Sequence, residues 1–311
     1  MRLYYSLFMP ARLIILGAGS ALPTRNNFPT SQILELREKQ FMIDCGEGTQ
    51  IRMRQMGLKI NRLGHIFISH LHGDHCFGLI GLISSFGMLN RTADLYVHGP
   101  AGIAALFEPQ LRFFCEGMPF KVIFEQFDAK KHTVIYEDRS VEVTTIPLKH
   151  RVPCSGFLFR EKPGERHIIR DMIDFYQVPI AQINLIKKGA DFVTSEGNVI
   201  PNEALTTPSD KTISYAYCSD TAYSEKIIPL INGVDLLYHE ATFAESEESR
   251  AKTTLHSTAA QAATIALKAN VSRLILGHFS ARYSNQQILL NEAKAVFKNV
   301  ILAEDMMVFE F

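Results

Sequence analysis

The chain has 311 residues, 47% of them hydrophobic, which is enough to bury one large core or two ordinary ones. Lys and Arg together number 32, as do Asp and Glu, so a non-specific polyanion binder is disfavoured and a nucleic-acid substrate would need a local basic face. No apolar run approaches the roughly 18 residues of a membrane span, and five scattered cysteines, never in C-x-x-C spacing, predict reduced thiols in a cytoplasmic protein.

Short strands dominate the first half of the chain. We expect a strand at 12–17, a hairpin from 31–37 and 39–46, and a short basic helix at 48–57. Further strand-like runs occupy 65–69, 94–99, 121–127, 141–148, 155–160, 213–220, 235–242, 273–280 and 299–311, and helical patterns occupy 99–114, 224–231, 257–269 and 285–297. This order predicts an α/β sandwich, with two packed sheets and helices outside, forming a single domain over residues 1–311.

Residues 161–188 interrupt this pattern with mixed charges, two prolines and a weak amphipathic helix. Two interpretations stay open. The segment is either an ordinary surface insertion or an arm that contacts a large substrate, because long irregular insertions often carry function.

Four metal-ligand side chains lie close together in "SHLHGDH". His70 and His72 are two apart at the end of a strand, so their side chains can share a face. Gly73 permits a turn, after which Asp74 and His75 begin a helix-like run. Imidazole nitrogens and a carboxylate in this arrangement are the ligands that zinc takes, and we predict a metal site here.

Three more ligand-type residues end otherwise apolar strands. They are His150 in "IPLKH", Asp220 in "AYCSD" and His278 in "LILGH". Each alone could be a cap or a turn residue. Together they fit a metal site at the rim of two sheets, where the connecting loops meet.

The H-x-H-x-D-H run and these later residues resemble the metallo-β-lactamase superfamily over nearly the whole chain. The resemblance implies an αβ/βα sandwich of two mixed sheets with a site for two metal ions along one edge. It assigns His70, His72 and His150 to one ion, Asp74, His75 and His278 to the other, and Asp220 to a bridge between them. Asp74 would also accept a proton from the attacking water. Asp44 is expected to hydrogen-bond near His70 or His72, or else to end a strand in a turn.

Motifs in the second half narrow the resemblance to the tRNase Z (ribonuclease Z) family. "HEAT" at 239–242, "HST" at 256–258, "SAR" at 280–282 and the "RNN" loop near the N-terminus occur in that family's order. The resemblance makes His256 a proton donor to the leaving oxygen, held and charged by Glu240, and it assigns phosphate or tRNA contacts to Arg25, Asn26, Ser280 and Arg282. The alternatives are a residue at a helix N-terminus for His256 and a surface ion pair for Arg282.

The family resemblance implies an endoribonuclease that removes the 3′ trailer from precursor tRNA, leaving a 3′-hydroxyl on the tRNA and a 5′-phosphate on the trailer. It also implies two Zn²⁺ ions per subunit, with Mn²⁺ possible, a homodimer, and a protruding tRNA-binding arm at 161–188. Arg52, Arg54, Lys59 and Arg62 form a basic stretch that would contact RNA, or else a solvated helix face. A small-molecule phosphodiesterase or lactonase of the same fold is the alternative enzyme, and a metal-free scaffold is the alternative class.

Overall fold

The computed structural model describes residues 11–24 and 27–311, which form two compact units. The described part of the larger unit is residues 11–24, 27–160 and 213–311, and that of the smaller unit is Glu161–Thr212. The predicted insertion at 161–188 is thus the first part of a longer unit. Across the described residues, no helix is long and apolar enough to cross a bilayer.

The first sheet of the larger unit has seven strands in the order β18-β1-β2-β3-β4-β5-β6. Its strands are β1 (Arg12–Gly17), β2 (Ser31–Leu36), β3 (Lys39–Cys45), β4 (Leu63–Phe67), β5 (Leu95–Pro100), β6 (Val122–Phe127) and β18 (Val308–Glu310). β18, β1, β2 and β3 pair antiparallel, whereas β3 to β6 pair parallel. The sheet is mixed, as predicted.

The second sheet also has seven strands, in the order β17-β16-β15-β14-β9-β8-β7. Its strands are β7 (Val134–Glu137), β8 (Val141–Pro147), β9 (Ser155–Glu161), β14 (Ser214–Cys218), β15 (Leu236–Glu240), β16 (Leu274–Gly277) and β17 (Val300–Leu302). β14 to β17 are parallel, and β14 pairs antiparallel with β9. This sheet is therefore mixed as well.

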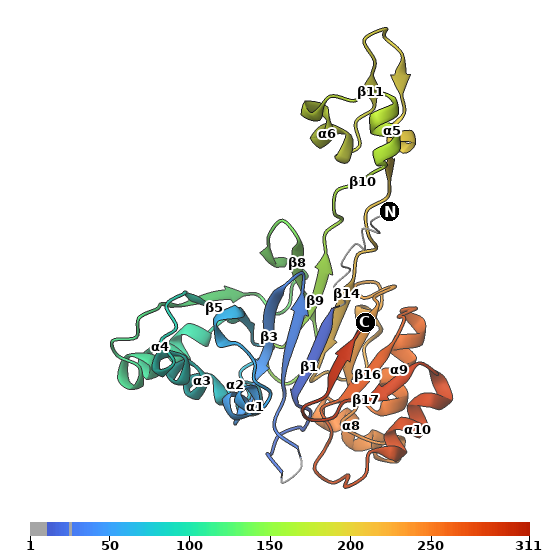
Figure 1. The fold of residues 1–311 in the computed structure, drawn as a ribbon. Coiled ribbons are helices and arrows are strands. Elements are labelled where there is room, and N and C mark those ends of the chain that lie inside the picture. The colour runs from blue at the N-terminus through green and yellow to red at the C-terminus, as the bar shows by residue number, and fades with distance from the viewer. Residues whose placement is uncertain (1–10, 25–26) are drawn as a thin grey trace. The chain divides into compact units, whose positions relative to one another are not determined.

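The two sheets pack face to face, with helices on their outer faces (Figure 1). Alternation along β1 divides its side chains, because Leu13 and Ile15 enter the core between the sheets while Ile14 and Leu16 enter the core under the outer helices. The Phe67 and Phe159 rings, one from each sheet, lie 5.3 Å apart. The outer helices are α1 (Thr49–Gln55), α3 (Gly78–Met88) and α4 (Ile103–Phe114) on the first sheet, and α9 (Ala259–Lys268) and α10 (Gln287–Val296) on the second. The αβ/βα sandwich is confirmed.

Short helices complete the larger unit. They are η1 (Ile60–Arg62), α2 (Gly73–Cys76), η2 (Glu225–Ile227), η3 (Glu245–Glu247) and α8 (Glu248–Thr254). α9 begins with a capping box, in which Thr258 and Gln261 bond each other's backbone N–H groups. This cap fixes the start of the helix directly after His256 and Ser257. Alanines on the buried face of α9 let it pack closely on β15 and β16.

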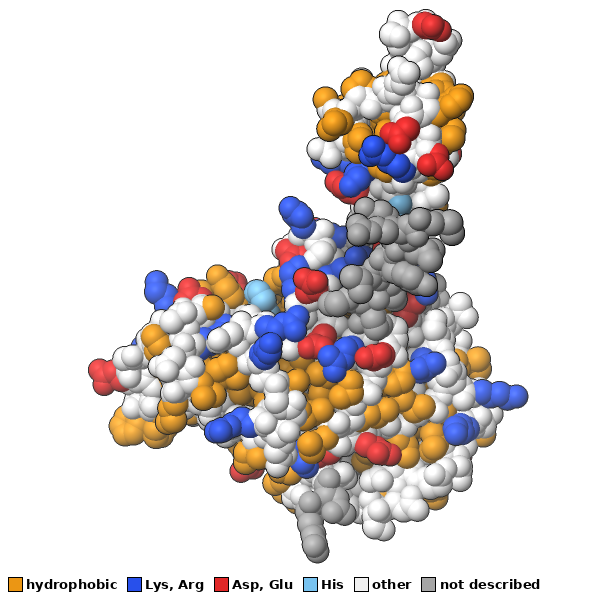
Figure 2. Space-filling view, viewed as in Figure 1, with side chains coloured by type: hydrophobic (Ala, Val, Ile, Leu, Met, Phe, Trp, Pro, Cys, Tyr) orange, Lys and Arg blue, Asp and Glu red, His pale blue; other side chains and the backbone are white. Residues whose placement is uncertain are grey.

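The smaller unit has a hydrophobic core of its own, centred on Ile173, Ile186 and Leu205. Its elements are β10 (His167–Ile168), α5 (Arg170–Phe175), α6 (Ile180–Lys187), β11 (Phe192–Val193), β12 (Val199–Ile200), α7 (Asn202–Leu205) and β13 (Thr206–Thr207). Residues 161–212 contain six Lys or Arg and eight Asp or Glu. Figure 2 shows hydrophobic side chains and both signs of charge on this unit. It is therefore a small folded unit without a uniformly basic surface.

Two predicted elements differ from the structure. The run 299–311 forms two strands, β17 and β18, which belong to different sheets. The helix predicted at 224–231 is reduced to the single 3₁₀ turn of η2. Ile228 still has helical backbone angles, but Pro229 has no N–H to donate, so the hydrogen-bond pattern of a helix is interrupted there.

Candidate metal centre

Strand ends of both sheets meet at one edge of the larger unit and bring the seven predicted ligands together. His70 to His75 follow β4, His150 follows β8, Asp220 follows β14, and His278 follows β16. The backbone leaves the extended region at these ends. Asp44, Asp220 and His278 have φ angles of 56°, 62° and 56°, a left-handed conformation that is uncommon for residues other than glycine.

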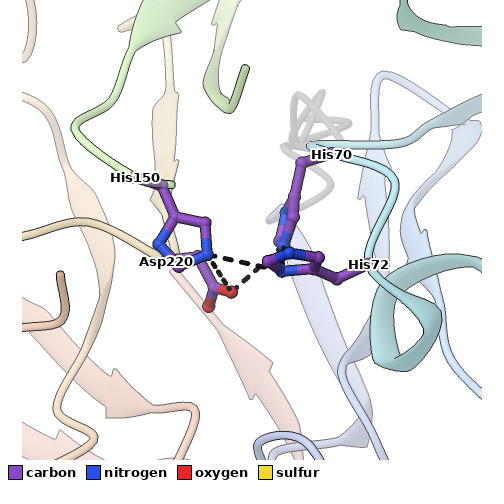
Figure 3. Close-up of side chains that lie close together, drawn as sticks. All are labelled: His70, His72, His150 and Asp220. Atoms are coloured by element: carbon purple, nitrogen blue, oxygen red, sulfur yellow. Dashed lines mark hydrogen bonds and ion pairs between the residues drawn. The ribbon is translucent and has the colours of Figure 1, made fainter. Parts of the chain in front are cut away.

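One group of ligand-type side chains consists of His70, His72, His150 and Asp220 (Figure 3). His70 Nε2 lies 2.9 Å from His72 Nδ1, and His150 Nε2 lies 3.4 Å from the same nitrogen. Asp220 Oδ2 is 3.2 Å from His70 Nε2 and 3.6 Å from His150 Nε2. These atoms converge on one point from three loops.

A second group consists of Asp74, His75 and His278. Asp74 Oδ2 lies 3.5 Å from His75 Nε2 and 3.7 Å from His278 Nε2. Asp220 also contacts this group, since its Oδ2 is 3.4 Å from His75 Nε2 and its Oδ1 is 2.8 Å from His278 Nε2. The Asp220 carboxylate therefore lies between the two groups.

In four of the histidines, the Nδ1 atom, which points away from the ligand groups, contacts a neighbouring protein group. His70 Nδ1 contacts Ser69 Oγ at 3.0 Å, His75 Nδ1 contacts Asp44 Oδ2 at 2.7 Å, His150 Nδ1 contacts the Leu255 carbonyl at 3.3 Å, and His278 Nδ1 contacts Thr242 Oγ1 at 3.0 Å. Each ring thus turns its Nε2 inward. Such contacts fix ring orientation, and those to a carboxylate or carbonyl also fix the tautomer that leaves a lone pair on the inner nitrogen.

The inward atoms fit a cation. The Nε2 atoms of His75 and His278 are buried and face the Asp74 and Asp220 carboxylates without forming a well-aligned hydrogen bond. Burial opposes ionisation of Asp220, but His278 and His75 hold the pKa of its carboxyl well below the usual value. Converging imidazole nitrogens around a buried carboxylate are the donor set that divalent zinc or manganese accepts.

Asp44 organises the wall behind the second group. It is fully buried and accepts hydrogen bonds from the Ser69 N–H at 2.7 Å, the Ser69 hydroxyl at 2.9 Å and the Tyr217 hydroxyl at 2.7 Å. Its direct histidine partner is His75, and it reaches His70 only through Ser69. Asp44 therefore lies buried near His70, as expected, while the ring that it contacts directly is that of His75.

Glu240 and His256 form a pair at the border of the site. Glu240 Oε1 lies 3.0 Å from His256 Nδ1, and the carboxylate also accepts from the N–H groups of Thr221 and Ser257. Burial disfavours a charged His256, but the Glu240 carboxylate raises the pKa of its imidazole above the ordinary value. The His256 ring stacks 5.5 Å from that of His278 and lines a cavity of about 340 Å³ with Asp74, Asp220 and His72. Its position also permits a ligand role with Asp220 and His278.

The predicted substrate-contact residues occupy different environments. The Arg282 Nε donates to Ser280 Oγ at 3.2 Å, while its Nη1 lies 3.1 Å from Glu247 and its guanidinium lies over the Phe243 ring. Arg282 therefore has the surface ion pair that its alternative interpretation anticipated, and it remains partly exposed. Arg25 and Asn26 lie outside the described residues.

A clamp that sequence reasoning missed holds the loop before β2. Asp305 accepts hydrogen bonds from the backbone N–H of Ala18 at 3.0 Å and of Phe28 at 2.8 Å, and it pairs with Arg52 at 3.2 Å. The Arg52 guanidinium lies 4.0 Å from the centre of the Phe28 ring. Arg52 is thus turned inward rather than toward a substrate. In the sequence, the only hint of this clamp is the pair of acidic residues Glu304 and Asp305, which interrupts the apolar run 299–311.

The clamped loop reaches the candidate metal centre. The Ala21 backbone N–H donates to Asp74 Oδ2 at 2.8 Å. This bond occupies one lone pair of a predicted metal ligand and orients the carboxylate. The loop is therefore part of the site's architecture.

Comparisons with known proteins agree with this arrangement. Residues 11–169 match the family model described as "Anti-Pycsar protein Apyc1". The chain is 62% identical over 295 residues to ribonuclease Z of Bacteroides thetaiotaomicron, covering 95% of this chain and 93% of that protein. It is 53% identical over 293 residues to ribonuclease Z of Porphyromonas gingivalis, covering 94% and 96%. The crystal structure of the short form of human tRNase Z superposes with a TM-score of 0.70 at 24% identity, covering 96% of this chain and 98% of that one.

The two mixed sheets, with the histidine–aspartate groups at their shared edge, define a protein of the metallo-β-lactamase fold. High identity along nearly the whole length assigns it more closely. The chain belongs to the ribonuclease Z family.

Proposed function

We propose that this protein is an endoribonuclease that removes the 3′ trailer from precursor tRNA, leaving a 3′-hydroxyl on the tRNA and a 5′-phosphate on the trailer. Family membership supports the substrate class. The observation that carries the chemistry is the Glu240–His256 pair beside the ligand groups, because hydrolysis of a ribose phosphodiester needs a proton donor for the departing 3′-oxygen.

His256 is the proposed proton donor. The Glu240 carboxylate, itself held by two backbone N–H groups and the Thr242 hydroxyl, favours the imidazolium and fixes the ring over the cavity. Asp74 is the proposed proton acceptor for the attacking water, in addition to its role as a ligand. The Ala21 N–H keeps the Asp74 carboxylate turned toward the cavity.

The proposed cofactors are two Zn²⁺ ions, with Mn²⁺ as the alternative metal. His70, His72 and His150 would hold one ion, Asp74, His75 and His278 the other, and Asp220 would bridge them. When bound, two such ions make water a nucleophile at neutral pH and neutralise charge on the phosphoryl group.

Substrate contacts are proposed for Arg25, Asn26, Ser280 and Arg282. Arg282 would release Glu247 and take a phosphate oxygen instead, because a guanidinium forms a stronger fork with a phosphate than a partly exposed carboxylate pair provides. The smaller unit, which contains 161–188, would be the tRNA-binding arm. Since its charge is nearly balanced, we expect its contact with tRNA to depend only weakly on salt.

A homodimer is proposed as the working form. Support comes from the apolar surface of α3 and α4, where Met88 is 79% exposed and Phe113 81% exposed, with Leu89 and Phe114 beside them in sequence. Cytoplasmic location is proposed from the nature of the substrate and from the five free, buried cysteines.

Incubation of zinc-loaded protein with a 3′-extended precursor tRNA, followed by mapping of both new ends, tests the proposal. We expect one cut after the discriminator base, with a hydroxyl on the tRNA and a phosphate on the trailer. A protein that leaves every precursor intact, yet turns over a lactone or a cyclic nucleotide, would instead be a small-molecule hydrolase of the same fold.

A further inference from the structure

A second cleft adjoins the metal centre. Its volume is about 780 Å³, and it shares His150 and Arg151 with the cavity over the ligand groups. The cleft is lined mainly by the loop that follows β8 and by residues that follow β14. Apart from His150, none of its lining residues has a role proposed above.

The lining of this cleft is cationic. Lys130, Lys149, Arg151 and Lys226 all line it and are all exposed, and no Asp or Glu among the described residues lines it. Within the described part of the chain, none of these four side chains forms an ion pair or hydrogen bond. Their charges therefore remain available to a ligand.

The neighbouring acids pair mainly with other side chains, and Asp128 adds only a weaker electrostatic interaction with Lys130. Asp128 pairs with Lys131 at 3.5 Å, and Glu225 pairs with Lys268 at 2.5 Å. Glu225 also accepts a hydrogen bond from the Tyr223 hydroxyl at 2.7 Å, which fixes that ring in the cleft wall. The cleft thus combines unpaired cations with an anchored aromatic ring, the combination that binds single-stranded nucleic acid.

The wall next to the metal centre is held in place. Lys149 donates its N–H to Thr221 Oγ1 at 3.2 Å and accepts from the Ala222 N–H at 2.9 Å. These bonds tie the loop that carries His150 to the loop that carries Asp220. Lys149 and Arg151, on either side of His150, therefore lie at fixed positions where the cleft meets the ligand groups.

We propose that this cleft binds the single-stranded 3′ trailer of the substrate, and this inference rests on the proposed function. His256, the donor to the tRNA's own 3′-oxygen, lines the smaller cavity and not the cleft. The tRNA end therefore occupies the His256 side. The trailer, which keeps the scissile phosphate, passes His150 and Arg151 into the cleft. Its phosphates contact the four cationic side chains, and one of its bases stacks on Tyr223.

The test uses a Lys130→Ala/Lys226→Ala double variant, because neither residue adjoins a metal ligand. Its matched control is Lys121→Ala/Lys298→Ala, which removes two exposed lysines outside the cleft. Each protein is assayed on one precursor tRNA carrying either a single-nucleotide trailer or a trailer of roughly eight nucleotides, a length typical of single-strand grooves.

We expect KM for the long trailer to rise by about tenfold in the cleft variant. The slope of log(kcat/KM) against log[salt] should also become shallower by about 1.4, because each of the two lost phosphate contacts contributes about 0.7 to it. KM and kcat for the single-nucleotide trailer should match those of wild type and control. An equal rise for both trailers would assign the cleft to the acceptor stem, and no rise for either would show that RNA does not use it; both results overturn the proposal. Failure of the wild-type protein to cut either precursor would instead refute the proposed function.

Discussion

Replacing Asp305 with alanine removes the clamp that holds the loop before β2. The Asp305 side chain is 8% exposed and serves three partners, namely two backbone N–H groups and Arg52. Charge-assisted hydrogen bonds contribute about 1.5–3 kcal/mol each, and breaking a buried ion pair costs about 3–5 kcal/mol. Because the three contacts share one carboxylate, they do not add. We expect the free energy of unfolding to fall by about 3–4 kcal/mol.

The same substitution should impair catalysis. Loosening the loop weakens the bond from the Ala21 N–H to Asp74 Oδ2, and a loss of about 1.4 kcal/mol there corresponds to about tenfold in kcat. Urea unfolding measures the first effect, and hydrolysis of bis(p-nitrophenyl) phosphate by the metal-loaded protein measures the second.

Two variants separate the contributions to the clamp. Arg52→Met keeps both backbone bonds to Asp305, which still compensate its charge. The loss of stability should therefore be smaller, about 1.5–3 kcal/mol, the range for one charge-assisted hydrogen bond. Glu304→Ala changes an exposed neighbour and should leave stability and turnover unaffected. Stability of Asp305→Ala within about 0.5 kcal/mol of wild type, together with unchanged kcat, would refute the reasoning.

Three further predictions concern the site and the smaller unit. Asp74→Ala should abolish cleavage and lower the amount of bound metal measured by atomic emission. Substantial residual cleavage would show that the Asp74 carboxylate is neither a ligand nor the proton acceptor. His256→Ala should lower kcat by about a hundredfold with metal content unchanged, and metal loss would make His256 a ligand instead. Arg160 pairs with Ser214 across β9 and β14, so a short turn can replace 161–212. That deletion should raise KM for precursor tRNA while sparing hydrolysis of bis(p-nitrophenyl) phosphate, and loss of both would make the unit structural.

The proximity of the candidate metal ligands follows in part from local sequence patterns. His70, His72, Asp74 and His75 lie within one strand end and one turn, so their proximity needs only strand and helix periodicity. His150, Asp220 and His278 each end an apolar strand, and parallel neighbours in a sheet end at the same edge. The parallel pairing accounts for Asp220 and His278, whereas the division of the ligands into two groups was implied by the family resemblance.

Contacts between residues far apart in the chain could not be predicted from local sequence patterns. Arg52 and Asp305 are 253 positions apart, and a basic residue on a short helix gives no sign of whether it faces solvent or a distant carboxylate. The division of 299–311 between two sheets was equally hidden, because both halves are apolar and the break at Asp305 resembles an ordinary polar interruption. The true extent of the smaller unit, to Thr212, depends on the pairing of β10 with β13.

At Asp220 and His278, stability and activity favour different residues, because both have a left-handed backbone conformation. Such conformations cost of the order of 1–3 kcal/mol for a residue with a side chain, whereas glycine adopts them without strain. A library screened only for thermal resistance should therefore accumulate glycine or asparagine at these strand ends. We expect only a simultaneous selection for activity to retain aspartate and histidine at both positions.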